Sequence, residues 1–437
     1  MNNLPFEIID IIVQYKKKSK IPITSLNKLL YSYRKLFSID FNYENINKFT
    51  TEFQIGTLTN VSELPIIINK NFNKIIFKNC FDEKIDDLPK NVTHLTFGSK
   101  FNKSVDTLPE KITHLTFGSK FNQNVDTLPE SIISLTFGWD FDKSVDTLPE
   151  KITHLTFGFN FNQNVDTLPE NITHLILGSD FNKSVDTLPE NIHHLTFGWD
   201  FNKSVDSLPE SITHLIFGTH FDKNVDNLPK NITHLTFGDD FNQNVDALSE
   251  SITHLTFGNH FNRKVDNLPN KILDLTFSWK FNQSVDKLPK SITNLTFNND
   301  FNKIVDTLPK NINHLTFGYK FNKSVDTLPE SITHLTFGND FNQSVDNLPQ
   351  NVTHLTFGNH FNQSVDTLPN KITHLTFGYK FNQNIDKLPD SITDLILRRA
   401  FNRKINNLPK NITYLKIRTN SKLLIKKYPH VVFDFIK

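Results

Sequence analysis

The stretch Phe101-Asn-Lys-Ser-Val-Asp-Thr-Leu-Pro-Glu-Lys-Ile-Thr-His-Leu-Thr-Phe-Gly-Ser-Lys120 is one of seventeen consecutive twenty-residue repeats that fill residues 81–420 without insertion or deletion. We count positions within a repeat from its first residue, which is always Phe. A strict period of this length is typical of a solenoid, in which each repeat forms one coil and buries its apolar side chains against neighbouring coils. The sequence therefore predicts an elongated repeat protein.

Each repeat carries six apolar positions, which in this stretch are Phe101, Val105, Leu108, Ile112, Leu115 and Phe117. The last three follow the L-x-x-L-x-L spacing of the strand turn in leucine-rich repeats. Alternation along the strand directs Leu115 and Phe117 inward, and His114 and Thr116 outward. Because position 9 is proline and twenty residues leave no room for a long helix beside a strand, we expect an extended or single-turn return segment. The strands would then stack in parallel, about 4.8 Å apart.

Three further positions are nearly constant, and we expect their residues to set the backbone conformation or to hydrogen-bond to backbone groups. Position 18 is glycine in thirteen repeats, which indicates a left-handed conformation at the strand end. Position 2 is always Asn or Asp, which predicts a ladder of side chains bonded to backbone groups. Position 6 is Asp from Asp86 to Asp386, ahead of a Leu-Pro or similar sequence, which is typical of turns and not of an acid-base pair.

The composition limits the classes of partner. The chain has 437 residues, with 47 basic and 46 acidic side chains, so it lacks the basic surface expected of a nucleic-acid-binding protein. Its single cysteine, Cys80, excludes a disulfide-stapled domain and favours a reducing compartment. No stretch approaches the roughly 20 apolar residues of a membrane-spanning helix, and the N-terminus does not resemble a signal peptide. We therefore expect an intracellular, cytoplasmic protein that binds neither nucleic acid nor membrane.

Repeats that read Leu-Thr-Phe-Gly-x-x-Phe-Asn, as at 95–102 and 115–122, resemble FNIP repeats. These are relatives of leucine-rich repeats, found mostly in social amoebae and in giant viruses of amoebae, so a viral member would act in the host cytoplasm. The resemblance covers residues 81–420, although the family's usual repeat is slightly longer. It implies a leucine-rich-repeat-like, β-rich solenoid with one short parallel strand per coil, acting as a protein-interaction module without catalysis.

The N-terminal sequence Leu4-Pro-Phe-Glu-Ile-Ile-Asp-Ile-Ile-Val-Gln-Tyr15 resembles the opening of an F-box, and residues 25–31 match its later helix more faintly. The resemblance implies a small α-helical domain over residues 1–45 that docks onto a Skp-type adaptor of a cullin ubiquitin ligase. The residues at the matching docking positions are Leu4, Pro5, Ile8 and Ile12. Lys16 departs from the family pattern, and a plain helical cap over the first coil explains the same residues. Both interpretations stay open at this point.

The chain thus divides into four regions. The helical region at 1–45 precedes an N-terminal cap with a degenerate first repeat at 46–80. The seventeen repeats at 81–420 are followed by a degenerate C-terminal cap at 421–437. Terminal segments that differ from the middle are expected of a solenoid, because its end coils have a neighbour on one side only.

Position 14 forms the most prominent polar column. It holds twelve histidines: His94, His114, His154, His174, His194, His214, His234, His254, His314, His334, His354 and His374. A linear row lacks the three or four converging ligands of a metal site and the partnered nucleophile or carboxylate of a catalytic site. We therefore interpret it as part of a partner-binding face, and predict no metal, no cofactor and no enzymatic activity. Neighbouring imidazoles should also resist double protonation, so stability should fall below about pH 6.5.

Position 19 varies most between repeats and carries large aromatic residues. Trp139, Trp199, Trp279, Tyr319 and Tyr379 are candidate contact anchors for a partner, while neutral variation at loop tips explains the same pattern. Two functional hypotheses result. The chain is either a substrate-recognition adaptor of a ubiquitin ligase, gripping its substrate through the histidine and aromatic columns, or a ligase-independent binding scaffold with a helical cap.

Overall fold

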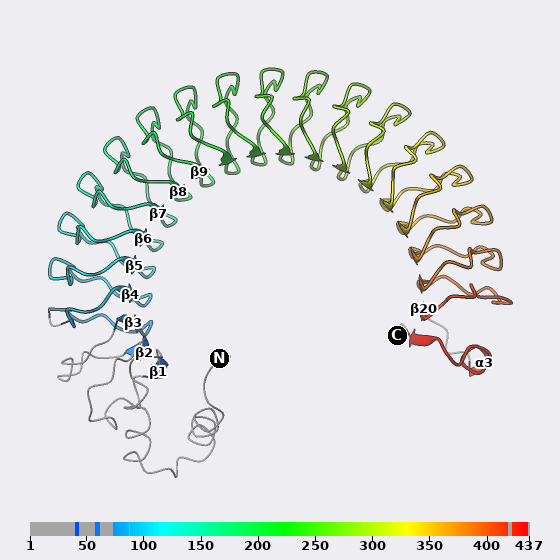
Figure 1. Ribbon diagram of the computed structural model, residues 1–437, viewed down its shortest axis with the longest axis horizontal. Helices are drawn as coiled ribbons and strands as arrows, with labels where there is room; N and C mark the ends of the chain where they lie inside the picture. The colour runs from blue at the N-terminus through cyan, green and yellow to red at the C-terminus, as the bar shows by residue number, and fades with distance from the viewer. Residues whose placement is uncertain (1–39, 43–56, 62–72, 87, 418–421, 436–437) are drawn as a thin grey trace, which may run out of the picture. The chain divides into compact units, whose positions relative to one another are not determined.

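The computed structural model describes residues 40–42, 57–61, 73–86, 88–417 and 422–435, and each repeat forms one coil with one short strand (Figure 1). Three strands precede the repeats: β1 (Asp40–Asn42), β2 (Thr57–Val61) and β3 (Lys74–Phe77). The repeats contribute β4 (His94–Thr96), β5 (His114–Thr116), β6 (Ser134–Thr136), β7 (His154–Thr156), β8 (His174–Ile176), β9 (His194–Thr196), β10 (His214–Ile216), β11 (His234–Thr236), β12 (His254–Thr256), β13 (Asp274–Thr276), β14 (Asn294–Thr296), β15 (His314–Thr316), β16 (His334–Thr336), β17 (His354–Thr356), β18 (His374–Thr376), β19 (Asp394–Ile396) and β20 (Tyr414–Ile417). Helix α3 (Lys422–Lys427) and strand β21 (Val432–Phe435) follow.

The described chain divides into two compact blocks, and the division falls within residues 183–193. In the first block, consecutive strands from β1 to β8 pair in parallel. In the second block, consecutive strands from β9 to β21 do the same. Within the repeats of each block the register places every residue beside its equivalent twenty positions away, for example His334 beside His354. The leucine-rich-repeat-like parallel solenoid predicted from the repeat is therefore confirmed.

The core consists of the six apolar positions. All six are buried in every coil from Phe81 to Leu397. In the strand at His114–Thr116, Leu115 is fully buried while its two neighbours point outward, as the alternation predicted. Because one coil has too few apolar residues to enclose a core, this burial exists only where coils lie on each other.

The spacing between coils increases from the strand side to the opposite side. Equivalent stacked histidine rings on the strands are 4.2–4.3 Å apart between centroids. The position-17 phenylalanine rings beneath them are 5.3–5.9 Å apart, and the position-1 rings deeper in the core are 5.9–6.3 Å apart. Each coil brings two phenyl rings into the core, so the coils fan out around them. Within each block the strands accordingly lie on the concave side (Figure 1).

The glycine column has a different cause from the one predicted. None of the twelve position-18 glycines described has a positive φ, so the expected left-handed conformation is wrong. A Cβ atom at Gly118 would instead lie 2.0 Å from the carbonyl oxygen of Gly98 in the preceding coil. Glycine is therefore required by close backbone approach. Ser278, Asn298 and Arg398 occupy the equivalent position in three other repeats.

Two polar ladders join the return segments, and only the one at position 2 was predicted as a ladder. The Asn102 side-chain oxygen accepts a hydrogen bond of 3.0 Å from the Asn122 backbone N–H, and the same contact recurs along both blocks. Asp106 accepts hydrogen bonds from Ser104 of its own coil and Thr127 of the next. These bonds hold the pKa of Asp106 below its usual value. The aspartate at position 6 therefore stabilises the turn of its own coil and the contact with the next coil.

The ends of the solenoid differ from the prediction in one respect. Strand β1 lies inside the region 1–45 that was expected to be helical, and Cα partners align Phe41 with Leu58 and Leu58 with Ile75. Ile75 in turn aligns with Leu95, so the backbone register of the repeat strands extends to β1. The expected helices and the docking residues Leu4, Pro5, Ile8 and Ile12 lie outside the described residues.

The close approach of the coils can be tested at Gly338, where an added Cβ would lie 1.7 Å from the carbonyl oxygen of Gly318. We expect Gly338→Ala to lower the free energy of unfolding by about 1–3 kcal/mol, as overpacking does elsewhere. The adjacent half-buried Asn339→Ala is the control and should change it by less than about 0.5 kcal/mol. Denaturant unfolding followed by circular dichroism measures both, and equal midpoints for Gly338→Ala and the unsubstituted protein would contradict the steric explanation.

Candidate functional site

The strand face consists of the outward side chains at positions 14 and 16 of the coils. Each repeat strand places one buried leucine between these two outward residues, as in the strand His334–Thr336. All twelve position-14 histidines are half-buried or exposed. Because the strands pair in register, the residues at each of these positions form a row within each block. The twenty-residue period of the sequence predicted these rows.

The histidines stack face to face. In the first block His94 stacks on His114 and His154 on His174. In the second block the ranges 194–254 and 314–374 each contain a run of four stacked rings. Ring centroids are 4.2–4.3 Å apart and planes differ by 7–22°. Ser134, Asp274, Asn294, Asp394 and Tyr414 occupy position 14 in the remaining repeats.

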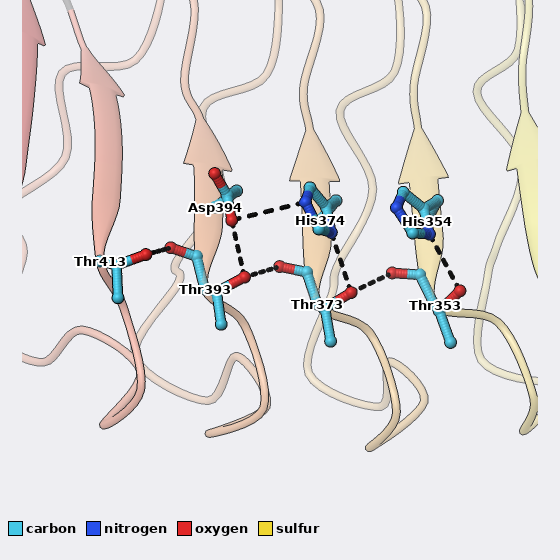
Figure 2. Close-up of polar contacts among 7 residues, drawn as sticks. All are labelled: Thr353, His354, Thr373, His374, Thr393, Asp394 and Thr413. Atoms are coloured by element: carbon cyan, nitrogen blue, oxygen red, sulfur yellow. Dashed lines mark hydrogen bonds and ion pairs between the residues drawn. The ribbon is translucent and has the colours of Figure 1, made fainter.

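A threonine at position 13 orients ten of the twelve rings. In ten coils its Oγ1 lies 2.8–2.9 Å from Nδ1 of the following histidine, as in Thr353–His354 and Thr373–His374 (Figure 2). The Thr373 hydroxyl also lies 3.2 Å from the carbonyl oxygen of Thr353 in the preceding coil. The threonine therefore engages Nδ1 and leaves the other ring nitrogen, Nε2, for other contacts.

The sequence analysis did not single out position 13, although the repeats contain a signal. The two repeats with an aliphatic residue there, Ile133 and Leu273, carry Ser134 and Asp274 in place of histidine. Histidine thus never follows an aliphatic residue at position 13. This association between adjacent positions could have indicated the Thr–His pair from the sequence alone.

The strand face favours neutral imidazoles. Burial lowers the pKa of His94, His234, His334 and His354 below 6.5, and repulsion from neighbouring histidines lowers it further. The predicted direction of the shift is therefore confirmed for these four residues. Its main cause is removal of the ring from water, whereas the sequence analysis considered repulsion alone.

The aromatic residues predicted as contact anchors form a second column in the turn after the strand. Trp139, Trp199, Trp279, Tyr319 and Tyr379 have exposed fractions between 46% and 66%. Phe159, which was not among the predicted anchors, lies against Trp139 with ring centroids 6.1 Å apart. The guanidinium of Arg398 lies over the Tyr379 ring at 5.7 Å. Apolar area that is exposed in a repeated column is typical of an interaction surface.

Position 20 holds a charged cluster that the sequence analysis missed. His220 Nδ1 lies 2.7 Å and His260 Nδ1 lies 2.9 Å from the Asp240 carboxylate, and His220 Nε2 lies 3.7 Å from Asp200. The hydrogen bond to Asp240 raises the pKa of His220 and lowers that of Asp240. The signal was the alternation Asp, His, Asp, His at position 20 of four successive repeats.

The arrangement offers surfaces for contact rather than converging reactive groups. Among the described residues, no three side chains of the His, Cys, Asp or Glu type gather closely enough to hold a metal ion. Within the same residues, no helix combines the length and the apolar character needed to cross a membrane. What the strand face does offer is a regular row of imidazoles and hydroxyls.

Comparison with known proteins identifies the repeat. The FNIP Repeat family matches in overlapping segments from residue 81 to residue 420. A solved structure described as a novel circular LRR protein, CroV588, is 37% identical with a TM-score of 0.77, and the alignment covers 85% of this chain and 65% of that one. YopM from Yersinia enterocolitica WA-314 is 15% identical with a TM-score of 0.49, covering 85% of this chain and 79% of that one. Among curated proteins, no sequence matches.

The lowered histidine pKa values predict a pH-dependent stability. A histidine whose folded pKa lies below 6.5 binds fewer protons than in the unfolded chain, so its contribution is complete above about pH 6.5 and is lost as the pH falls. His220 acts oppositely, because its raised pKa stabilises the fold at low pH. The strand face carries four histidines with a lowered pKa, so we expect a lower melting temperature at about pH 5.5 than at about pH 7.5.

The matched control replaces His94, His234, His334 and His354 with glutamine, which cannot titrate. This variant should show a smaller difference in melting temperature between the two pH values. Aspartates with lowered pKa values are ionised at both and so contribute nothing to the difference. An equal or higher melting temperature at about pH 5.5 for the unsubstituted protein would refute the prediction.

Proposed function

The chain belongs to the FNIP repeat family, and from this premise we propose that it is a non-catalytic scaffold that binds a partner protein through its strand face. A leucine-rich-repeat-like solenoid is suited to protein interaction, because stacking places equivalent residues in one extended concave surface. The observation that carries the proposal is the alignment of exposed histidines into runs of stacked rings on that surface.

Two features support binding of a protein rather than of a small molecule. The rows extend over many coils without a converging set of polar groups, whereas a small-molecule site is a cavity with a few such groups. The exposed aromatic column at position 19 runs along the same coils, and Trp and Tyr residues are enriched among the side chains that dominate binding energy at protein interfaces. The partner would therefore span several coils.

Substitutions on opposite sides of the same coils test this proposal. We expect His334→Ala with His354→Ala to weaken partner capture at least about tenfold, because two adjacent contacts at the centre of the strand face are lost. The control, Lys323→Ala with Glu330→Ala, changes two exposed return-segment residues and should leave capture unchanged. Crosslinking followed by mass spectrometry of the captured protein measures both, and equal loss in the two variants would refute the assignment of the face.

We further propose that the N-terminal segment docks onto a Skp-type adaptor, which would make the chain a substrate-recognition subunit of a cullin ubiquitin ligase in the cytoplasm. Support comes from the F-box-like sequence around Leu4 and Pro5 and from the single cysteine, which suits a reducing compartment. The alternative is a ligase-independent scaffold in which residues 1–45 only cap the first coils. The solenoid would select the substrate in the first case and act alone in the second.

Leu4→Ala with Pro5→Ala separates these alternatives. If the segment docks, the double variant should lose co-purification with the ligase core, while its melting temperature stays unchanged. Deletion of residues 1–39, which leaves strand β1 and its pairing with β2 in place, should then abolish ligase binding and spare partner capture. A double variant that still co-purifies would exclude this docking site, and a deletion that merely lowers the melting temperature would favour the cap.

A further inference from the structure

An open cavity of about 390 Å³ lies beside the turns that follow strands β13, β14 and β15, within the second block. Position 2 contributes three amides to its lining and position 20 contributes three charged side chains: Asn262, Asn282, Asn302, Lys280, Asp300 and Lys320. A cavity of this size has room for a polar group of a ligand. The chemistry that it accepts depends on the direction of the amides and on the charges that stay unpaired.

The position-2 ladder fixes which end of each amide is available to a ligand. Asn262 Oδ1 accepts the Asn282 backbone N–H, and Asn282 Oδ1 accepts that of Asn302, both at 3.0 Å. Asn302 does the same for the next coil. Because a backbone N–H can only donate, the atom that it meets must be the amide oxygen. The three NH2 groups therefore point away from the ladder, and they donate to no other residue that the structure describes.

Lys280 gives the cavity a positive charge that is not compensated. Lys320 Nζ lies 2.8 Å from Asp300 Oδ1, so these two side chains neutralise each other. Lys280 makes no ion pair within the described part of the chain. The charged residues at positions 3 and 4 of the same coils are all cations, namely Arg263, Lys264 and Lys303. The cavity thus combines one unpaired ammonium group with three amide donors.

The carboxylates nearest to the cavity in the chain have other partners. Beyond its two ends, Asp240 lies 2.9 Å from His260 Nδ1 and Asp340 lies 3.2 Å from His360 Nδ1. The position-6 aspartates of coils 261–320 do not line the cavity, and each contacts a Lys, Ser or Thr side chain of the return segments. They therefore leave the charge of Lys280 without a direct partner.

The preceding coils lack this combination of groups. In coils 201–260, position 20 holds the His220, Asp240 and His260 cluster described above, and position 2 includes Asp222. Asp222 Oδ1 accepts the Asn242 backbone N–H at 2.9 Å. Its second carboxylate oxygen therefore stands where an asparagine would present an NH2 group. The donor-rich cavity is thus a property of coils 261–320 and not of the repeat in general.

Building on the proposed protein-binding function, we infer that this cavity receives a carboxylate side chain from an acidic segment of the partner. Carboxylate oxygens accept hydrogen bonds and carry the charge that complements Lys280, whereas Arg or Lys would place donors against donors. The three amides follow one another on successive coils, an arrangement that suits a segment extended along the solenoid. Trp279 precedes Lys280 and is 56% exposed, so it offers the same segment an apolar contact.

Asn282→Asp tests the amide donor while it keeps the ladder. Asp142 Oδ1 accepts the Asn162 N–H at 3.0 Å, so an aspartate at position 2 preserves the bond between coils. The full-length variant should therefore melt like the unsubstituted protein. A carboxylate in place of the NH2 group should weaken binding of fluorescein-labelled hexaglutamate at least about tenfold, measured by fluorescence anisotropy at pH 7.5. Asn342→Asp makes the same change two coils beyond the cavity and should change binding by less than about twofold.

Lys280→Gln and Lys290→Gln form a second matched pair. Each removes one positive charge from neighbouring coils, but Lys290 is an exposed return-segment residue that does not line the cavity. Lys280→Gln should weaken hexaglutamate binding about two- to fivefold, as expected for an exposed charge pair, and Lys290→Gln should leave it unchanged. Hexaarginine and inorganic phosphate serve as comparison probes, and both should bind the unsubstituted protein at least about tenfold more weakly than hexaglutamate.

Three results would overturn the inference: no binding of hexaglutamate, a preference for hexaarginine, or equal effects within either pair of variants. Inorganic phosphate that binds as tightly as hexaglutamate would assign the cavity to a small anion and would also overturn the acidic segment. The His334 and His354 variants test the strand face separately, so either proposal can fail without the other.

Discussion

The fold depends on the close approach of consecutive coils along their strand side. At position 18 a side-chain carbon would lie 1.7–2.0 Å from the carbonyl oxygen of the preceding coil, so the normal spacing admits only hydrogen there. This spacing allows strands of three residues to pair in register. A single pair of strands this short would not be stable, because an isolated two-stranded sheet is at best marginally stable in water. Each coil therefore owes its conformation to its neighbours.

The same constraint explains the curvature within each block. In most coils two phenylalanine rings fill the core, and equivalent rings lie 5.6–6.1 Å apart, farther than the 4.2–4.3 Å between stacked histidine rings on the strands. Because consecutive coils lie close together on the strand side and farther apart on the side filled by phenylalanine, they cannot stack in parallel planes. Asn and Asp at position 2, and Asp at position 6, still bond between coils on the wider side. These bonds satisfy backbone and hydroxyl groups that would otherwise depend on water.

Register turns a local pair of residues into an extended surface. A Thr–His pair in one coil fixes one ring, and stacking in register repeats the fixed ring every 4.2–4.3 Å. Burial of the rings in this row lowers the pKa of four of these histidines. The position-19 aromatic column adds exposed apolar area along the turns of the same coils. A macromolecule that contacts several coils at once can use both columns.

The twenty-residue period, the inward positions of the core and the outward histidines were predictable from the sequence, because in a solenoid the spacing along the chain maps directly onto the position around the coil. The position-2 ladder and the position-6 turns were predictable for the same reason. The cause of the glycine column was not, because the contact joins residues of two coils whose separation the sequence does not contain. The Thr–His geometry, the histidine burial that lowers the pKa values and the Asp240 cluster likewise depend on distances between coils. Sequence thus determined which residues face outward, and tertiary structure decided how closely they meet and therefore which protonation state they adopt.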